Sequence, residues 1–558
     1  MSNRRSTTSV LALACSILAL SSAFGQGVPP QSTPEETIRG TVVNRLTHEP
    51  IARALVLSPD KEFATLTDND GHFAFSFLSP DGDAGKPSWP NALMARKPGF
   101  IEDPSQLYAA VPGKELTITL APEALVIGHV LLPSSETPDR IEVEIYRRQV
   151  EDGWAHWVSA SSTTTKSNGE FRFAELAAGS YKLLTRELLD RDPVSFRPGS
   201  QIFGYPPAYF PNAADFSSAE TIQLVPGQTM QAAISLVEQA YYPVKVALPN
   251  LPPDPDVRVS VAPQGHKGPG YSLGYSGSGE LQGLLPNGTY TIEATSFGRP
   301  PRTGSVNITV DGRAVEGPRL ILVPNRAIPV EVKEEFTSPP DSNPPGVSSR
   351  GSKRDVQGPS AYLGLNLDPA DDFDARPASL RSSPGVGNDS LVIDYVPPGR
   401  YWVRVGSSRG YASSVTSGGI DLKRQPLVVP SSRPIEVTMR DDWAEVDGTV
   451  ENMAATSGVG GPNRSGVIYT ESSAHAYFIP QPESPGEFRD AWVSPEGKIN
   501  LSRVPPGLYR VLAFDRPQSD LEYHDREAMR AYETEGRLIR LLPGQNEPLR
   551  VPLIRSSE

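Results

Sequence analysis

Two distant stretches of the chain, NLSRVPPGLYRVLAFD at 500–515 and LVIDYVPPGRYWVRVG at 391–406, share the motif Val-Pro-Pro-Gly-x-Tyr. Apolar and polar residues alternate on both sides of the motif, which is the period-2 pattern of two strands joined by a turn. The proline fixes φ and the glycine accepts a positive φ, so the Pro-Gly pair favours a tight corner. Looser versions of the pattern occur at 176–183 and 285–292. The motif is therefore either a repeated binding site or a corner that the fold requires.

A tyrosine follows the glycine by two residues in all four copies. The copies that run from Gly169 and from Gly497 match each other position for position, and the copy that begins at Gly279 is one residue shorter. Such a strand–corner–strand pattern resembles the tyrosine corner of Greek-key sandwiches, in which the phenol bonds to nearby backbone and the ring enters the core. Recurrence once per repeat favours this structural interpretation over ligand contacts for Tyr181, Tyr290, Tyr401 and Tyr509.

Short alternating segments that would open each repeat begin at positions 38, 126, 242, 328 and 446, so the starts are 88, 116, 86 and 118 residues apart. Each interval has the size of one small β-sandwich domain. The sequence therefore predicts an all-β fold, with tandem Greek-key β-sandwich domains of transthyretin-like or immunoglobulin-like type after a signal peptide. The expected domains are 37–122, 123–240, 241–326, 327–442 with a flexible insert at 336–359, and 443–556 with a short helix at 520–533.

The first repeat contains four further motifs: Gly40-x-Val42, Pro50-Ile51-x-x-Ala54-x-Val56, Thr67-Asp68-x-Asp70-Gly71-x-Phe73 and Lys97-Pro98-Gly99-Phe100. With these motifs it resembles the carboxypeptidase regulatory-like domain, a transthyretin-like sandwich. The resemblance implies a seven-strand Greek-key domain, similar in fold to carbohydrate-binding sandwiches, that is found beside peptidase, transporter and adhesin domains and has no chemistry of its own. It is weaker in the other four repeats, and the first repeat lacks a Gly-x-Tyr corner at 79–95.

The first 25 residues have the three parts of a secretory signal peptide. Arg4 and Arg5 precede an apolar run at 10–20, which is too short to span a membrane, and small residues follow it. We expect cleavage after Gly25, an extracytoplasmic location (periplasmic or secreted) and no transmembrane segment. The only cysteine, Cys15, lies inside the apolar run, so the expected mature chain has no thiol for a disulfide, a metal site or a nucleophile.

Composition narrows the class of partner. The formal net charge of −13 becomes −15 when the two arginines of the signal peptide are removed, so no nucleic-acid partner is expected. Proline, at 57 of 558 residues, is about twice as frequent as usual, which favours short strands joined by turns.

The seven histidines supply no recognised metal or catalytic motif. His524 and Glu527 have the His-x-x-Glu spacing of carboxypeptidase-like zinc sites, but no histidine follows them to complete the ligand set. The segment that holds them is expected to be the charged helix at 520–533, capped by Ser519 or Asp520. We therefore expect no cofactor, no metal and no catalytic residue, and predict that the chain is not an enzyme. An enzyme with a site assembled between domains is the alternative that stays open.

Aromatic residues in two segments of the second repeat are candidates for stacking on sugar rings. Packing of the rings within their own domain is the alternative, since two residues three apart on a strand point to opposite faces. The candidates are Trp154 and Trp157 in DGWAHWVS, and Tyr205, Tyr209 and Phe210 in FGYPPAYFP.

These observations predict a non-enzymatic exported multidomain protein with a binding or scaffold role. The expected partner is a polysaccharide or a cell-envelope protein, and the carbohydrate part rests on likeness of fold, which is weak evidence for function. A further alternative is an accessory module of a cell-envelope transport or peptidase system.

Overall fold

The structure is a computed structural model of the chain. The expected signal peptide at 1–25, most of the expected insert at 336–359 and most of the segment 79–95 lie outside the residues that it describes. The described residues are 35–78, 90–101, 107–111, 113–133, 137–189, 201–251, 256–276, 279–298, 300–337, 359, 362–371, 373, 378–382, 391–430, 433–453, 474–482, 484–494, 496–546 and 548–555.

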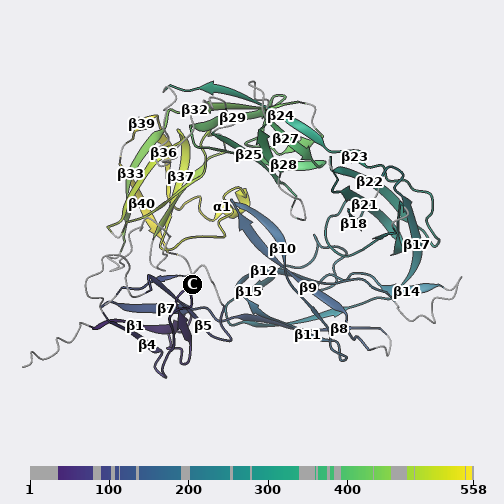
Figure 1. Cartoon of the computed structure of the whole chain (residues 1–558), viewed down its shortest axis with the longest axis horizontal. Helices are drawn as coiled ribbons and strands as arrows, with labels where there is room; N and C mark the ends of the chain where they lie inside the picture. Colours follow the sequence, from purple (N-terminus) through teal and green to yellow (C-terminus); the bar gives the residue numbers. More distant parts are fainter. Residues whose placement is uncertain are drawn as a thin grey trace, which may run out of the picture.

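The buried apolar residues form five large cores that follow one another along the chain. We name each stretch by its core: unit 1 is 38–120, unit 2 is 124–236, unit 3 is 244–322, unit 4 is 328–439 and unit 5 is 444–551. The units run around a closed arc in Figure 1, from purple through blue, teal and green to yellow. The expected all-β class of successive sandwiches is confirmed. That each expected domain range folds independently stays a prediction.

Units 1 and 2 each consist of two facing sheets. Unit 1 contains β1 (Glu35–Asn44), β2 (Leu55–Leu57), β3 (Ala64–Leu66), β4 (His72–Leu78), β5 (Ala92–Arg96), β6 (Tyr108–Ala109) and β7 (Glu115–Leu120). Its sheet orders are β4-β1-β7 and β3-β2-β5-β6. Unit 2 contains β8 (Ala124–Leu131), β9 (Glu142–Glu151), β10 (Trp154–Thr164), β11 (Glu170–Leu176), β12 (Gly179–Thr185), β15 (Ile222–Leu224) and β16 (Thr229–Ser235). Its sheet orders are β10-β9-β12-β15 and β11-β8-β16.

Unit 3 takes two short strands from the stretch that belongs to unit 2 by sequence. These are β13 (Leu188–Leu189) and β14 (Ile202–Tyr205), and unit 3 itself adds β17 (Gln239–Ala247), β18 (Val257–Pro263), β19 (Gly274–Tyr275), β20 (Glu280–Pro286), β21 (Gly288–Ser296), β22 (Arg302–Val310) and β23 (Val323–Pro324). The sheet orders are β13-β14-β17-β20-β19 and β18-β21-β22-β23. The two strands between 188 and 205 therefore join the sheet of unit 3, although the expected second domain at 123–240 includes them.

Units 4 and 5 have larger, connected sheets. Unit 4 contains β24 (Arg326–Glu335), β25 (Leu363–Pro369), β26 (Ala378–Ser382), β27 (Leu391–Val396), β28 (Gly399–Ser407), β29 (Tyr411–Ser417), β30 (Ile420–Asp421), β31 (Leu427–Val429) and β32 (Ile435–Arg440). Unit 5 contains β33 (Ala444–Glu451), β34 (His475–Pro480), β35 (Arg489–Trp492), β36 (Lys498–Val504), β37 (Gly507–Phe514), β38 (Arg537–Leu541), β39 (Gly544–Gln545) and β40 (Leu549–Ile554).

One topology recurs in all five units. The opening strand pairs antiparallel with a middle strand of its unit and parallel with a later segment of the same unit. In units 2 to 5 the strand before the corner pairs with the opening strand, and the strand after it pairs with a strand of the other layer. The chain therefore crosses from one layer of the sandwich to the other at every Pro-Gly or related corner, as a Greek key requires.

All four predicted corner tyrosines are confirmed. Each ring is at most 3% exposed, and each hydroxyl donates to the carbonyl four residues earlier. Burial raises the pKa of all four phenols, to about 12 for Tyr401. The donor–acceptor distances are 2.7 Å from Tyr181 to Ala177, 3.0 Å from Tyr290 to Pro286, 3.0 Å from Tyr401 to Pro397 and 2.6 Å from Tyr509 to Pro505.

A β-bulge precedes three of these corners. Glu175, Tyr395 and Arg503 have φ values of 57°, 54° and 58°, and the pairing with the opening strand shifts by one residue beside each of them. In unit 3 the pairing of β17 with β20 runs without a shift. The missing bulge residue accounts for the copy of the motif that is one residue shorter.

The expected helix at 520–533 is wrong in extent. The helix α1 covers only Arg526–Arg530, and its cap is Asp525, whose side chain accepts from the backbone N–H groups of Glu527 and Ala528. Residues 521–524 instead form an irregular segment that ends in a turn and contacts unit 2. A short charged segment gains little as an isolated helix, so tertiary contacts decide its conformation.

We predict that replacing Arg503 by valine weakens the corner of unit 5. A β-branched residue is strained at positive φ, which costs about 1–2 kcal/mol, whereas Arg503→Gly removes that strain. Hydrogen exchange in the intact chain should show a protection loss of roughly five- to thirtyfold in β36 and β37 for Arg503→Val. Ser502→Val is the matched control, because Ser502 is exposed on the same strand and has no positive φ. Equal protection in the two valine variants would contradict the role of the bulge.

Candidate functional site

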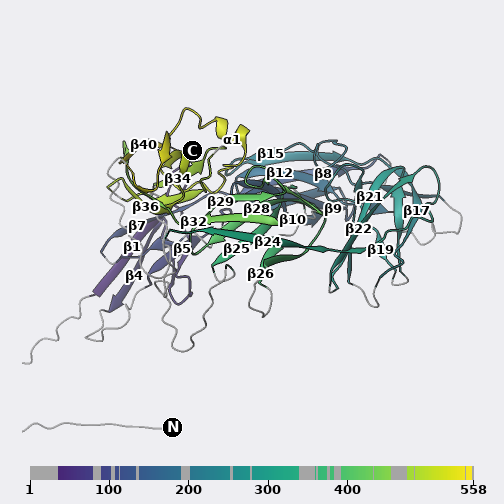
Figure 2. The same ribbon diagram turned by 90° about the horizontal axis from the view of Figure 1, so that it is seen from above.

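The hairpin β9–β10 carries unit 2 into contact with units 4 and 5. Its strands have 10 and 11 residues and are joined by Asp152 and Gly153, both at positive φ, the two-residue turn that Asp-Gly favours. Figure 1 shows the tip of the β9–β10 hairpin, where β10 begins, beside α1, and Figure 2 shows β10 close to β28 in the middle of the molecule. We call the contacts of the tip, residues 148–154, with units 4 and 5 the hairpin contact.

Trp154 is stacked between rings from two other units. Its centroid lies 4.2 Å from that of Trp402 on β28 and 4.4 Å from that of His524, with interplanar angles of 19° and 9°. Two rings lying flat at these distances on one face would overlap, so Trp402 and His524 cover opposite faces of the indole. Stacked aromatic pairs stabilise by roughly 0.5–1.5 kcal/mol beyond the area they bury.

Arginine–carboxylate pairs surround this stack. Arg148 of the hairpin forms a two-bond pair with Glu522 of unit 5, in which Nη2 lies 2.6 Å from Oε2. Arg404 of unit 4 contacts Asp152 at the hairpin tip and Asp368 on β25, with 3.1 Å from its Nε to Asp368 Oδ2. The two arginines thus tie the tip of the hairpin to both neighbouring units.

Gly153 allows the closest approach of the hairpin to unit 5. A Cβ atom at this position would lie 2.7 Å from three atoms of the Tyr523 ring. Tyr523 in turn stacks on Phe488 at 4.0 Å and 5°, and the backbone N–H of His524 donates to the Gly153 carbonyl at 3.4 Å. Position 153 therefore requires glycine for two reasons: its φ is 78°, and a side chain there would collide with the ring of Tyr523.

The sheet face behind the hairpin tip packs against units 3 and 4. A separate buried cluster there joins Tyr146, Leu184, Tyr209, Phe216 and Ala219 of unit 2 with Trp157 and with Phe373 from unit 4. Lys182 lies 5.1 Å above the rings of both Trp157 and Phe216 and donates to two carbonyls. The hydroxyl of Tyr209 donates to Pro269 of unit 3 at 2.7 Å.

The five aromatic residues proposed for sugar stacking therefore all lie in packing contacts. Trp154 belongs to the hairpin contact, and Trp157 and Tyr209 belong to the cluster between units 2, 3 and 4. Tyr205 and Phe210, at 5% and 9% exposure, belong to the core of unit 2. None of the five presents two open ring faces in this arrangement, and they do not form one surface.

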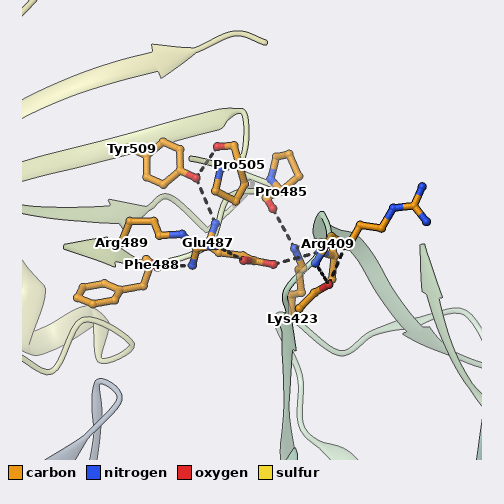
Figure 3. Close-up of polar contacts among 10 residues, drawn as sticks. Arg409, Lys423, Pro485, Glu487, Phe488, Arg489, Pro505 and Tyr509 are labelled. Carbon is orange, nitrogen blue, oxygen red and sulfur yellow. Dashed lines mark hydrogen bonds and ion pairs between the residues drawn. The ribbon is translucent and has the colours of Figure 1, made fainter. Parts of the chain in front are cut away.

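Units 4 and 5 meet through a third contact, drawn in Figure 3. The Nζ atom of Lys423 donates to the carbonyls of Ala412 in its own unit and Pro485 in unit 5, the latter at 2.9 Å. Glu487 accepts from the N–H of Ala412 at 3.2 Å, and its own N–H donates to the corner hydroxyl of Tyr509. Burial lowers the pKa of Lys423, and Glu487 opposes that shift.

The chemistry of the hairpin contact is that of an ion-paired interface. Burial of its ring lowers the pKa of His524 to about 4, so the imidazole is neutral at pH 7 although part of the residue is exposed. Glu522, Asp152 and Asp368 are each bound by an arginine. Within the described residues no group of three or more His, Cys, Asp or Glu side chains could hold a metal ion.

Comparisons with known proteins give no family. No protein-family model matches the chain, and no curated protein matches it. The carboxypeptidase regulatory-like resemblance is therefore unconfirmed, while the sandwich fold that it implied is present. In the part of the chain that the structure describes, no helix has the length and apolar character needed to cross a membrane.

Several solved structures of bacterial proteins, two of them a pilin and a pilus protein, are similar in part. The Bacillus anthracis TIE protein is 9% identical, with a TM-score of 0.14 over 74% of this chain and 68% of that chain. GBS52, the minor pilin of Streptococcus agalactiae, is 13% identical, with a TM-score of 0.17 over 36% and 95%. The RrgB pilus protein of Streptococcus pneumoniae is 9% identical, with a TM-score of 0.14 over 70% and 90%. TM-scores this low support no conclusion about function.

We predict that Gly153→Ala opens the hairpin contact. The new methyl group collides with Tyr523 in addition to straining the turn, so hydrogen exchange of 521–525 should rise and the fluorescence of the stacked tryptophans should shift. Gly265→Ala is the matched control, since Gly265 has a φ of 82° but a Cβ atom there would meet no other atom within 4 Å. Similar behaviour of the two variants would show that turn strain, not the contact, is responsible.

Proposed function

We propose that the chain is a non-enzymatic exported scaffold whose units 2 to 5 act as one rigid body closed by the β9–β10 hairpin. The observation that carries this proposal is the sandwich of Trp154 between Trp402 of unit 4 and His524 of unit 5. Export is supported by the signal-peptide pattern of residues 1–25. A closed body differs from a flexible string of domains because it presents its surfaces in a fixed geometry.

The free energies expected of the single contacts indicate that several of them together hold units 2 to 5 in one arrangement. An exposed ion pair contributes only about 0–1 kcal/mol, so the arginine pairs alone would not hold together units that are far apart in the sequence. The aromatic stacks and the buried cluster around Phe216 add apolar area, at about 25 cal/mol per Å² removed from water. Two further pairs support the closed arrangement: Lys267 of unit 3 with Asp371 at 2.6 Å, and Lys423 with Pro485.

The partner in this proposal is a cell-envelope protein. The chain would act on it either as a rigid spacer or as an accessory module of a transport or peptidase system. Polysaccharide binding is the second candidate from the sequence. In the closed arrangement it would require Trp154, Trp157 or Tyr209 to leave inter-unit contacts. Binding of sugar should then loosen the body, which makes the two candidates distinguishable.

An enzyme with a site assembled between units is the remaining alternative. The hairpin contact does bring Glu522 and His524 of unit 5 near Asp152 of unit 2. The carboxylates, however, are neutralised by arginines and the imidazole lies flat on an indole, which supports a holding role. A hydrolase activity of the intact chain that is lost in His524→Ala or Glu527→Ala would favour the enzyme.

We predict that Trp154→Ala extends the molecule. Small-angle X-ray scattering of the intact chain should show a larger radius of gyration and maximum dimension, because the stack that joins three units is lost. The same variant should become sensitive to protease between units. Trp492→Ala is the control, since Trp492 packs on His475 within unit 5.

Two outcomes would contradict the rigid scaffold. Scattering from the wild-type chain that requires an ensemble of extended arrangements would exclude a closed body. Retention of the wild-type chain on a polysaccharide, lost in Trp154→Ala, Trp157→Ala and Tyr209→Ala but not in Trp492→Ala, would favour the sugar-binding function.

A further inference from the structure

The edges of the sheets carry backbone hydrogen-bonding groups that their own sheet does not use, and natural proteins protect such edges with bulges, charges or proline. The strands of seven or more residues that end a sheet are β4, β10, β11, β16, β18 and β36. The pairing of β10, β11 and β36 is shifted by a bulge, and β18 contains Arg258 and Pro263. Of these described strands, β4 and β16 alone have none of the three protections.

Strand β4 is the better suited of the two to pair with another strand. Its phenylalanines face the core of unit 1 and alternate with exposed small or polar residues, whereas β16 has no aromatic residue. Aromatic pairs across neighbouring strands stabilise a sheet. In Figure 1 β4 lies on the side of β1 that is remote from β7 and unit 5, and Figure 2 shows it again at the outer end of unit 1. The free edge of β4 therefore faces away from unit 5.

The backbone groups of β4 alternate between those that bond to β1 and those that point outward, as in any antiparallel pair. The N–H of Val42 donates to the carbonyl of Gly71 at 2.9 Å, so the odd-numbered residues of β4 bond to β1 and the even-numbered ones point outward. The turn before β4 agrees with this alternation, because His72 donates its N–H to the Asp68 side chain and accepts from the Asp68 N–H. Among the described residues, the outward groups after His72 therefore have no backbone partner.

These outward groups are complementary to those of a second copy of the same strand. When two copies run antiparallel with Phe75 facing Phe75, the N–H and C=O of Ala74 meet those of Ser76 in the other copy. Each of the two Ala74–Ser76 pairs then forms two hydrogen bonds. The Phe75 residues take the position without hydrogen bonds, where side chains approach most closely, and Phe75 is the most exposed phenylalanine of the strand at 9%. The edge of β4 therefore fits itself.

The distribution of charge also favours contact between two copies at this edge. The chain has a formal net charge of −13, so two copies repel each other in most orientations. Strand β4 contains no Asp, Glu, Lys or Arg. On the same sheet Arg39 of β1 lies beside Ala74, and Glu115 of β7 lies beside Arg39, so charges of opposite sign flank the edge. Contact at β4 therefore brings uncharged residues together.

We propose that the chain self-associates through β4, which pairs antiparallel with β4 of a second copy and joins the two β4-β1-β7 sheets into one continuous sheet. This inference goes beyond the scaffold role, because it places a second copy of units 2 to 5 at a fixed position relative to the first. Stable interfaces bury about 1,200–2,000 Å², and a contact along one strand pair is smaller. The dimer is therefore in reversible equilibrium with the monomer.

The test is sedimentation equilibrium of the intact chain over a range of concentrations, which gives the dissociation constant of the dimer. Ser76→Pro removes an outward N–H and leaves the bonds to β1 in place, since proline is tolerated where the N–H faces away from the sheet. Each copy then loses one hydrogen bond to the other, so the dissociation constant should rise at least about tenfold. Ser76→Ala keeps the N–H and is the matched control. Hydrogen exchange of β1 checks that unit 1 stays folded.

Two double variants test the pairing without a proline, because the side chains of Ala74 and Ser76 are exposed and would lie opposite each other in the dimer. Ala74→Glu with Ser76→Glu places like charges opposite each other, so the dissociation constant should rise by up to about tenfold, whereas Ala74→Glu with Ser76→Lys places opposite charges there and should restore association. The proposal is overturned if the wild-type chain sediments as a monomer at every concentration, or if folded Ser76→Pro associates like the wild type. Equal association of the two double variants would exclude antiparallel pairing across Phe75.

Discussion

The hydrogen bond from a corner tyrosine to the carbonyl four residues earlier is the constraint on which units 2 to 5 depend. It holds the chain where it leaves one sheet and enters the other, and its ring fills the core at that point. Such a hydrogen bond contributes a net free energy of about 1 kcal/mol to stability. Removing the hydroxyl costs more, about 1–3 kcal/mol, because it leaves a carbonyl unpaired inside the protein. In the described part of unit 1 a different tyrosine bonds to backbone: the hydroxyl of Tyr108 accepts from the N–H of Thr119 at 3.1 Å.

The sequence was sufficient to predict this level of structure because the corner is local. Alternation, Pro-Gly and a tyrosine at a fixed distance all lie within one short stretch, which therefore reports the strand, the turn and the next strand together. Even the shorter copy from Gly279 to Tyr290 had a structural meaning, since it lacks the left-handed bulge residue that Glu175, Tyr395 and Arg503 supply elsewhere. The helix at 520–533 was predicted wrongly because its conformation is decided by contacts with residues 148–154, far away in the sequence.

The candidate site could be predicted only by residue type. Aromatic side chains near a turn are typical of both a sugar-binding surface and an interface between domains. The residues that cover them are far away in the sequence, so a local pattern cannot decide between the two. Trp154 is covered by Trp402, which is 248 positions later, and by His524, which is 370 positions later. Of the residues at this site, only the Asp152-Gly153 pair is a specific local signal, because Asp-Gly is typical of a two-residue hairpin turn. The tip of such a hairpin is exposed unless another part of the chain contacts it.

The arrangement of the units is therefore specified by what differs between repeats, not by what they share. Strands β9 and β10 have 10 and 11 residues, whereas β34 and β35, which also follow the opening strand of their unit, have 6 and 4. Four extra residues at about 3.3 Å each extend a strand by roughly 13 Å, which is enough to carry the tip of the hairpin beyond its own sandwich. An element that all the repeats share can also contribute to a contact between units. The corner hydroxyl of Tyr509 donates to the carbonyl of Pro505 and accepts from the backbone N–H of Glu487, and the side chain of Glu487 contacts unit 4. In that way a bond that stabilises one unit also positions the residue that joins it to the next, so the folding of unit 5 and its docking on unit 4 depend on the same atom.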